Sequence, residues 1–209
     1  MADPESAPMP PISIVPDDPS ASNTEDVALM GAVARGDDAA FERLVAKHQN
    51  AVIGTISKMT GRPSDAEDLA QQVFVRVWKS APRYTATAKF TTWLFTIVRN
   101  LVFNDTRRSF RRHELSLEAR EEDSHIEQPD ALTPQPDADL LHNEVREAAD
   151  RAIASLPEPQ RMAVVMRRFE DSSYEEIATV LGTSVPAVKS LLFRARQQIR
   201  DALKAFLED

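Results

Sequence analysis

The chain has 209 residues, of which 42% are hydrophobic, and its formal net charge is -8. It contains no cysteine, which excludes disulfides, thiolate-bound metals and cysteine nucleophiles. No apolar run approaches the roughly 18 residues that a transmembrane helix needs, and the N-terminus lacks the basic and apolar segments of a signal peptide. We therefore expect a cytoplasmic protein with no membrane insertion.

The net charge conceals two neighbouring blocks of opposite sign. Residues 73–112 contain nine Lys and Arg against one acidic residue, whereas residues 113–150 contain two against twelve. A basic block of this kind is typical of a surface that binds nucleic acid, and the acidic block beside it indicates a connector.

Residues 1–24 hold six prolines and few large apolar side chains, so we expect them to be disordered. Apolar residues then recur at the 3.6-residue period of α-helices, which predicts an all-α protein. Thr24 is the expected N-cap of the first helix, and Gly36 is its expected end. A second helix is expected over about residues 41–56.

The third helix is expected to begin with a capping box formed by Ser64 and Glu67. Its inward-facing residues should be Leu69, Val73, Phe74, Val77 and Trp78. A further helix is expected from about Thr91 to Arg112, followed by an acidic linker over residues 113–139. Residues 140–207 show several shorter helical patterns. The predicted fold is therefore all-α, with two small helical domains, 25–112 and 140–207, joined by a flexible acidic linker.

The second of these domains ends in a helix-turn-helix pattern. A short apolar helix begins near Ser173, and Gly182 follows where a helix end requires a positive φ. A longer helix starts after Thr183 and Ser184, which is the spacing of a DNA-binding helix-turn-helix.

The last helix carries a basic face, and no acidic residue occurs from Gly182 to Arg200. A solvated basic face on an ordinary helical hairpin is the alternative that a charge run alone would favour. The turn and the lack of acids favour DNA binding, with the N-terminal half of the helix at base edges and the rest at phosphates. The candidate contacts are Pro186, Lys189, Ser190, Phe193, Arg194, Arg196 and Arg200.

The start of this helix has two candidate caps. If Ser184 is the N-cap, Pro186 lies at N2 and lacks an amide that would be unsatisfied in any case. If Val185 is the N-cap, the restriction on the residue before a proline is removed, but the serine cap is lost. The sequence leaves both open, and in both the proline marks where the helix begins.

Three segments together resemble the extracytoplasmic-function (ECF) sigma factors: DAEDLAQQVFVRVWK, FTTWLFTIVRNLVFNDTRR and LPEPQRMAVVMRRFEDSSYEEIATVLGTSVPAVKSLLFRARQQIR. The resemblance covers about residues 25–112 and 140–207, in the order of the family's two domains. It implies a bacterial initiation factor that binds core RNA polymerase and directs it to promoters.

The resemblance assigns the helix with DAEDLAQQVF to the clamp helices of the largest polymerase subunit. The matching positions are Asp65, Asp68, Gln71, Gln72 and Phe74. A capped and solvated helix face would explain the two aspartates equally well. Many members carry a glutamate where Gln72 stands, so one charge of this contact is missing.

The resemblance assigns residues 83–112 to opening and reading the minus-10 element. Aromatic and basic residues alternate here, a pattern suited to single-stranded DNA. Asn100 matches a position that reads a base edge, and the last four arginines would contact phosphates. The alternative role for Phe90 and Trp93 is in the hydrophobic core, and for Trp93 we favour that role. The candidates are Arg83, Tyr84, Lys89, Phe90, Arg99, Asn100, Arg107, Arg108, Arg111 and Arg112.

The resemblance assigns the last helix to the minus-35 element, with Leu191 where many members have an arginine. The implied partners are the flap region of polymerase and promoter DNA, both duplex and single-stranded. An anti-sigma factor is a further candidate partner. The acidic linker would run near the template strand and the RNA exit path, where we expect it to occupy a basic channel before nucleic acid does.

Two other functions fit the sequence less well. The four histidines are scattered, and no phosphate-binding loop or nucleophile elbow occurs, so we expect no enzyme activity, metal or cofactor. A helix-turn-helix regulator that acts without core polymerase would share the C-terminal half. Such a regulator would not need DAEDLAQQVF or the basic, aromatic block, so we favour the initiation factor.

Overall fold

The computed structural model describes residues 19–117 and 138–204, with the side chains of 22–108 and 144–204. In these ranges all regular structure is helical, as the sequence predicts. The elements are α1 (Pro19–Val33), α2 (Asp38–Thr60), α3 (Pro63–Ser80), the short 3-10 helix η1 (Ala81–Arg83), α4 (Phe90–Leu117), α5 (Ala138–Ala154), α6 (Glu158–Phe169), α7 (Tyr174–Leu181) and α8 (Val185–Ala202).

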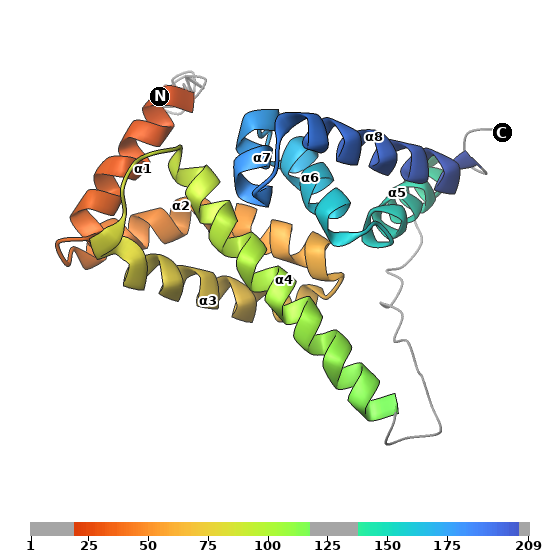
Figure 1. The fold of residues 1–209 in the computed structure, drawn as a ribbon, viewed down its shortest axis with the longest axis horizontal. Coiled ribbons are helices and arrows are strands. Elements are labelled where there is room, and N and C mark those ends of the chain that lie inside the picture. The colour runs from red at the N-terminus through yellow and green to blue at the C-terminus, as the bar shows by residue number, and fades with distance from the viewer. Residues whose placement is uncertain (1–18, 118–137, 205–209) are drawn as a thin grey trace, which may run out of the picture.

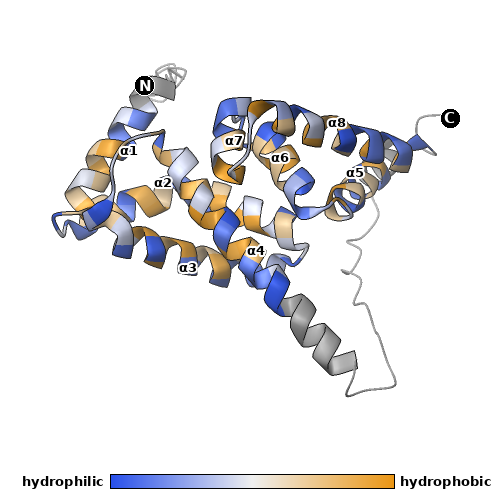
Figure 2. Cartoon of the chain, viewed as in Figure 1, coloured by the Kyte–Doolittle hydropathy of each residue, from blue (hydrophilic) through white to orange (hydrophobic). Residues whose placement is uncertain are grey.

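Helices α1 to α4 form the N-terminal domain, in which α2 lies between α1 and α3 and also contacts α4 (Figure 1). Apolar residues three and four positions apart give each of the longer helices one face that packs inward. The most buried of these side chains include Met30, Leu44, Val52, Val73 and Leu94. The apolar stripes of these helices alternate with hydrophilic surface along their length (Figure 2).

Helices α5 to α8 form the second domain. Helix α8 packs against α5, α6 and α7, with Leu156, Met162, Met166, Ile177 and Val188 fully buried between them. The C-terminal half of α8 is mostly hydrophilic on its outer side (Figure 2). The two domains also touch, because α7 lies against α4 and α6 lies against α2 (Figure 1).

Two glycines end helices in the way that the sequence predicts. Gly61 (φ 67°) follows α2, and Gly182 (φ 65°) follows α7. Both adopt the left-handed conformation that a side chain disfavours. At Ser173 a complete capping box begins α7: its hydroxyl accepts from the Glu176 amide, while the Glu176 carboxylate accepts from the Ser173 amide.

Two predicted helix starts are wrong. Helix α1 begins at Pro19 rather than after Thr24, which suits a proline because the first helical amide has no partner within the helix. Helix α3 begins at Pro63 with Arg62 before it, and its first turn has no side-chain cap. The hydroxyl of Ser64 instead donates to Asp65, so the capping box with Glu67 does not form.

The predicted linker is shorter at its start than expected, because α4 continues to Leu117. Residues 118–137, the rest of that segment, lie outside the described residues, as do residues 1–18. The boundaries of the two domains therefore remain a prediction.

Candidate DNA-binding surfaces and protein-docking groove

Helices α7 and α8 meet at 97° across the turn Gly182–Thr183–Ser184. The amide of Gly182 donates to the carbonyls of Ala178 and Thr179, which closes the last turn of α7. Ser184 is the N-cap of α8, with extended backbone and a hydroxyl that accepts from the Ala187 amide at 3.4 Å. Of the two caps that the sequence leaves open, the structure has the serine, and Pro186 lies at N2.

One side of α8 is buried and the other is open. Val188, Leu192 and Ala195 pack into the domain. All seven residues predicted to face DNA are exposed, and Phe193, at 63% exposure, is among the most exposed large apolar side chains. Ser190 donates its hydroxyl to the Pro186 carbonyl at 3.1 Å, which leaves the oxygen free to accept. This face carries hydrogen-bond donors, cations and apolar groups, which are the chemical groups that base edges in a major groove can contact.

The N-terminal domain carries a second basic surface, on η1, the loop after it and α4. Arg83, Lys89, Asn100, Arg107 and Arg108 are exposed on it. The remaining arginines of the prediction differ: Arg99 is half-buried over the Phe103 ring, and the side chains of Arg111 and Arg112 lie outside the described residues.

The aromatic residues of this segment form a cluster with one another. The ring centroids of Tyr84 and Trp93 are 5.0 Å apart, and those of Phe90 and Trp93 are 5.8 Å apart. Phe90 is only 1% exposed, so the prediction that its ring contacts DNA is wrong for this structure: it belongs to the core. Trp93 is partly buried against the core, as favoured from the sequence. Burial and the nearby charge of Asp26 raise the pKa of Tyr84.

Helix α1 supports this loop through polar residues that the sequence analysis missed. The Asn23 side chain accepts from the Phe90 amide at 2.8 Å, at the start of α4. Asp26, 1% exposed, lies 2.6 Å from Lys47 and 3.1 Å from His48 of α2. The His48 ring in turn packs on Phe90, with centroids 5.2 Å apart. A charged residue within an apolar helix was the available signal, because aspartate is rarely buried without partners.

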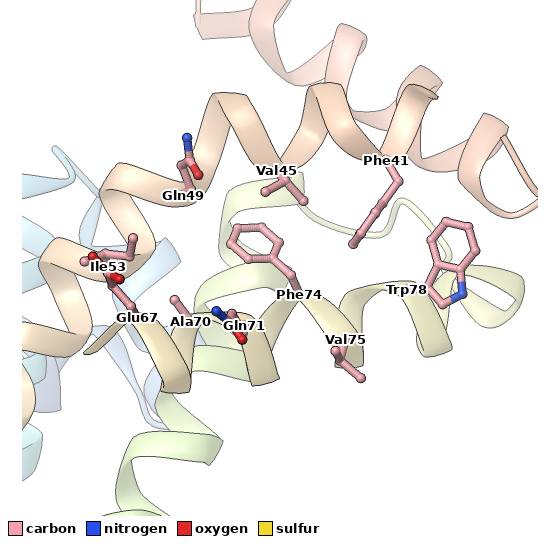
Figure 3. Close-up of a pocket in the computed structure, with 10 residues that line it drawn as sticks. All are labelled: Phe41, Val45, Gln49, Ile53, Glu67, Ala70, Gln71, Phe74, Val75 and Trp78. Carbon is pink, nitrogen blue, oxygen red and sulfur yellow. The ribbon is translucent and has the colours of Figure 1, made fainter. Parts of the chain in front are cut away.

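A groove runs between α2 and α3, and its lining is mostly apolar. Phe41 and Trp78 lie at one end, with ring centroids 5.0 Å apart, while Glu67 and Gln71 lie toward the other end (Figure 3). Trp78 is 36% exposed and Val75 is 50% exposed. Trp78 was expected to face inward, but it lies on the rim of the groove.

Only some of the residues predicted to bind polymerase line this groove. Phe74 and Gln71 line it, and Phe74 is otherwise buried. Asp68 and Gln72 are exposed on α3. Asp65 is partly shielded and lies 2.9 Å from Arg62, which also pairs with Asp105 of α4. The Asp65 carboxylate thus already has a partner that holds α3 to α4.

Among the described residues, no group of three or more histidine and acidic side chains could hold a metal ion. No single helix in the described ranges has the length and apolar character to cross a membrane; the bent α7–α8 pair meets that criterion by length and composition only.

The fold and these two surfaces define a two-domain helical protein with a helix-turn-helix. Two family models match the chain: Sigma-70 region 2 over residues 44–112, and Sigma-70, region 4 over residues 146–199. RNA polymerase sigma-H factor of Pseudomonas aeruginosa is 34% identical over 187 residues, covering 88% of this chain and 97% of that protein. The ECF sigma-E factor of Escherichia coli K12 is 32% identical over 185 residues, covering 87% and 96%.

The chain therefore belongs to the ECF sigma factors, which are transcription initiation factors and not enzymes. As such it directs RNA polymerase to promoters through regions 2 and 4. Two solved structures share the fold at 24% identity: CnrH in complex with the cytosolic domain of CnrY (TM-score 0.62, 87% of this chain and 98% of that chain), and the sigma factor RpoE in complex with the anti-sigma factor NepR from Bartonella quintana (TM-score 0.61, 78% and 96%).

Proposed function

We propose that α8 reads the minus-35 element in duplex DNA, and that the basic surface of α4 opens and reads the minus-10 element. The observation that carries this proposal is the exposure of all seven predicted residues on one face of α8, which has no acidic residue before Asp201. Lys189 and Arg194 lie in its N-terminal part, where recognition helices contact bases. Arg196 and Arg200 are further along, where phosphates are the expected partners.

At the minus-10 element, exposed Asn100 is the candidate base reader, since its amide can donate and accept at once. Arg83, Lys89, Arg107 and Arg108 supply positive charge for the DNA backbone. Because Phe90 is buried, the candidate stacking ring in this proposal is Tyr84, which is only partly covered. Stacking on such rings is worth roughly 1–3 kcal/mol per base.

Core polymerase would bind the groove between α2 and α3. The exposed rim residues Val75 and Trp78 supply apolar area, and Asp68, Gln71 and Gln72 supply polar contacts beside it. Interfaces commonly combine an aromatic anchor with such a polar rim. The partner surface would be the clamp helices of the largest subunit, while the second domain meets the flap region. An anti-sigma factor would compete for these surfaces, and the protein would act in the cytoplasm, where its polymerase is.

The test is reconstitution of transcription with core polymerase on promoters selected from genomic DNA. We expect the chain to direct specific initiation that core alone does not support. Asp68→Ala combined with Gln71→Ala should weaken core binding without lowering thermal stability, because both side chains are exposed. Glu42→Ala, an exposed acidic residue of α2 outside the groove lining, is the matched control. Footprinting of duplex DNA by the chain alone, with no initiation at any promoter, would favour a conventional regulator instead.

A further inference from the structure

The loop between η1 and α4, residues 84–89, lies within the surface proposed to read the minus-10 element, and we refer to it as the minus-10 loop. It runs beside α1, which contacts both η1 and α4 (Figure 1). Residues 85–89 are all exposed. Only its ends are held: Tyr84 packs partly on the core, and Phe90, just after the loop, is 1% exposed. The position of the loop therefore depends on what holds these two residues.

The start of α4 has no acceptor of its own for its first amide. The Lys89 carbonyl accepts from the Trp93 amide at 3.2 Å, which places Lys89 at the N-cap position. N-cap residues usually accept from the amides that follow them, but a lysine side chain carries only donors. Within α4 the Phe90 amide would thus have no partner.

The missing acceptor comes from α1. The side-chain oxygen of Asn23 accepts from the Phe90 amide at 2.8 Å, across 67 residues of sequence. Among the described residues, this is the side-chain hydrogen bond that joins α1 to the start of α4. Asn23 therefore acts as the cap of a helix to which it does not belong.

The turn of α1 that carries Asn23 is itself fixed to α2. Lys47 donates to the Ser22 carbonyl at 3.2 Å, directly before Asn23. Asp26, three residues after Asn23 and hence on the same side of α1, is buried against Lys47. The Asn23 oxygen is thus held in place from both sides along the helix, so it is a fixed reference point for the loop.

We propose that Asn23 is a positioning residue for minus-10 recognition, because the cap that it supplies sets where the minus-10 loop presents Tyr84 and Lys89 to the opened strand. The ring of Phe90 keeps its contacts with His48 and Trp93 when the cap is removed, so the core of the domain survives. The loop and the first turn of α4 are what loosen. This inference rests on the proposed assignment of this surface to the minus-10 element.

The test uses the full chain, alone and assembled with core polymerase on a promoter that supports initiation. In the free chain, Asn23→Ala should speed hydrogen exchange at the Phe90 amide about fivefold, the usual effect of losing an N-cap. In the holoenzyme it should lower the equilibrium between open and closed complexes, read from permanganate reactivity of minus-10 thymines, by a similar factor of about five. Binding to core and to minus-35 duplex should be unchanged.

Asn23→Asp is the rescuing variant, because a carboxylate accepts from the same amide and suits a helix N-terminus. It should restore slow exchange and promoter opening. Ser22→Ala is the matched control: its neighbouring side chain is removed, while the carbonyl that Lys47 uses remains.

Wild-type opening in Asn23→Ala, or an Asn23→Asp variant as defective as Asn23→Ala, would overturn the positioning role. An equal loss of core binding in Asn23→Ala would also overturn it, because Asn23 would then support the whole domain. Asn100→Ala separates this inference from the assignment on which it rests. If Asn100→Ala also leaves opening intact, the assignment of the surface fails; if it impairs opening and Asn23→Ala does not, only the role of Asn23 fails.

Discussion

The buried aspartate of α1 gives a prediction whose size follows from the structure. Asp26 is 1% exposed and lies 2.6 Å from Lys47 and 3.1 Å from His48. Removing one partner of a buried ion pair typically costs about 3–5 kcal/mol. Here Lys47 is 27% exposed and keeps Glu25 at 2.9 Å, so only His48 is left without a charged partner. We expect Asp26→Ala to lower the free energy of unfolding by about 2–3 kcal/mol, below that range.

The pKa of Asp26 determines how the stability difference between wild type and Asp26→Ala changes with pH. Burial opposes ionisation of Asp26, but the hydrogen bonds and charges of His48 and Lys47 outweigh it, so the pKa of Asp26 lies below its usual value. A carboxylate with a lowered pKa stabilises the folded chain above its unfolded pKa, about 4, and this contribution is lost as the pH falls through the folded pKa. The difference between wild type and Asp26→Ala should therefore shrink below about pH 4.

Urea denaturation between pH 3 and pH 8, followed by circular dichroism, measures both quantities. Glu25→Ala is the control, because that exposed carboxylate contacts the same Lys47 and should cost far less. Hydrogen exchange at the Phe90 amide should also quicken in Asp26→Ala, since α1 supplies its acceptor, Asn23. A stability equal to wild type at neutral pH, or a loss that persists unchanged in acid, would refute the reasoning.

Four further substitutions test other parts of the structure. Gly182→Ala should lower stability by about 1–2 kcal/mol in urea denaturation, since φ is 65° and the added Cβ meets no neighbour. Burial raises the pKa of Glu170, so Glu170→Gln should stabilise the chain at neutral pH, and the gain should vanish in acid, where the native carboxyl is protonated. Arg194→Ala should weaken minus-35 binding by roughly 1–3 kcal/mol with relaxed specificity in competition assays. Asn100→Ala should impair promoter opening, measured by permanganate footprinting, while core binding is unchanged.

The sequence predicts the second domain better than the first because its signals are local. The expected start of α7 near Ser173, its expected end at Gly182 and Ser184, one of the two candidate caps of α8, all lie within twelve residues. At the start of α3 the same rule fails. Pro63 already fixes the first turn there, and the Ser64 hydroxyl bonds to Asp65 instead of the backbone. A serine is a cap only if the chain before it is extended, and that depends on how the preceding helix ends.

In residues 83–112, the segment proposed to read the minus-10 element, local sequence patterns do not reveal which aromatic side chains are buried. Phe90 and Tyr84 stand in the same mixture of aromatic and basic residues, and either ring would suit a base. What separates them is α1, more than sixty residues earlier, whose Asn23 binds the Phe90 amide and fixes that ring in the core. Sequence spacing carries no information about this contact, because α1 has no apolar pattern strong enough to reveal which element it covers.

The blocks of charge along the sequence also do not reveal which charged residues pair in the fold. Counting charges along the chain places Lys89 in a basic block and Glu176 in a short acidic run, and nothing in either block predicts their 2.7 Å contact across 87 residues. The pairing matters because an acidic protein can bind DNA only where its cations are free of its own acids. On α8 the absence of acids from Gly182 to Arg200 secures this within the helix. At Lys89 the cation is already paired with Glu176 of the second domain, so in this arrangement it is not free of the protein's own acids.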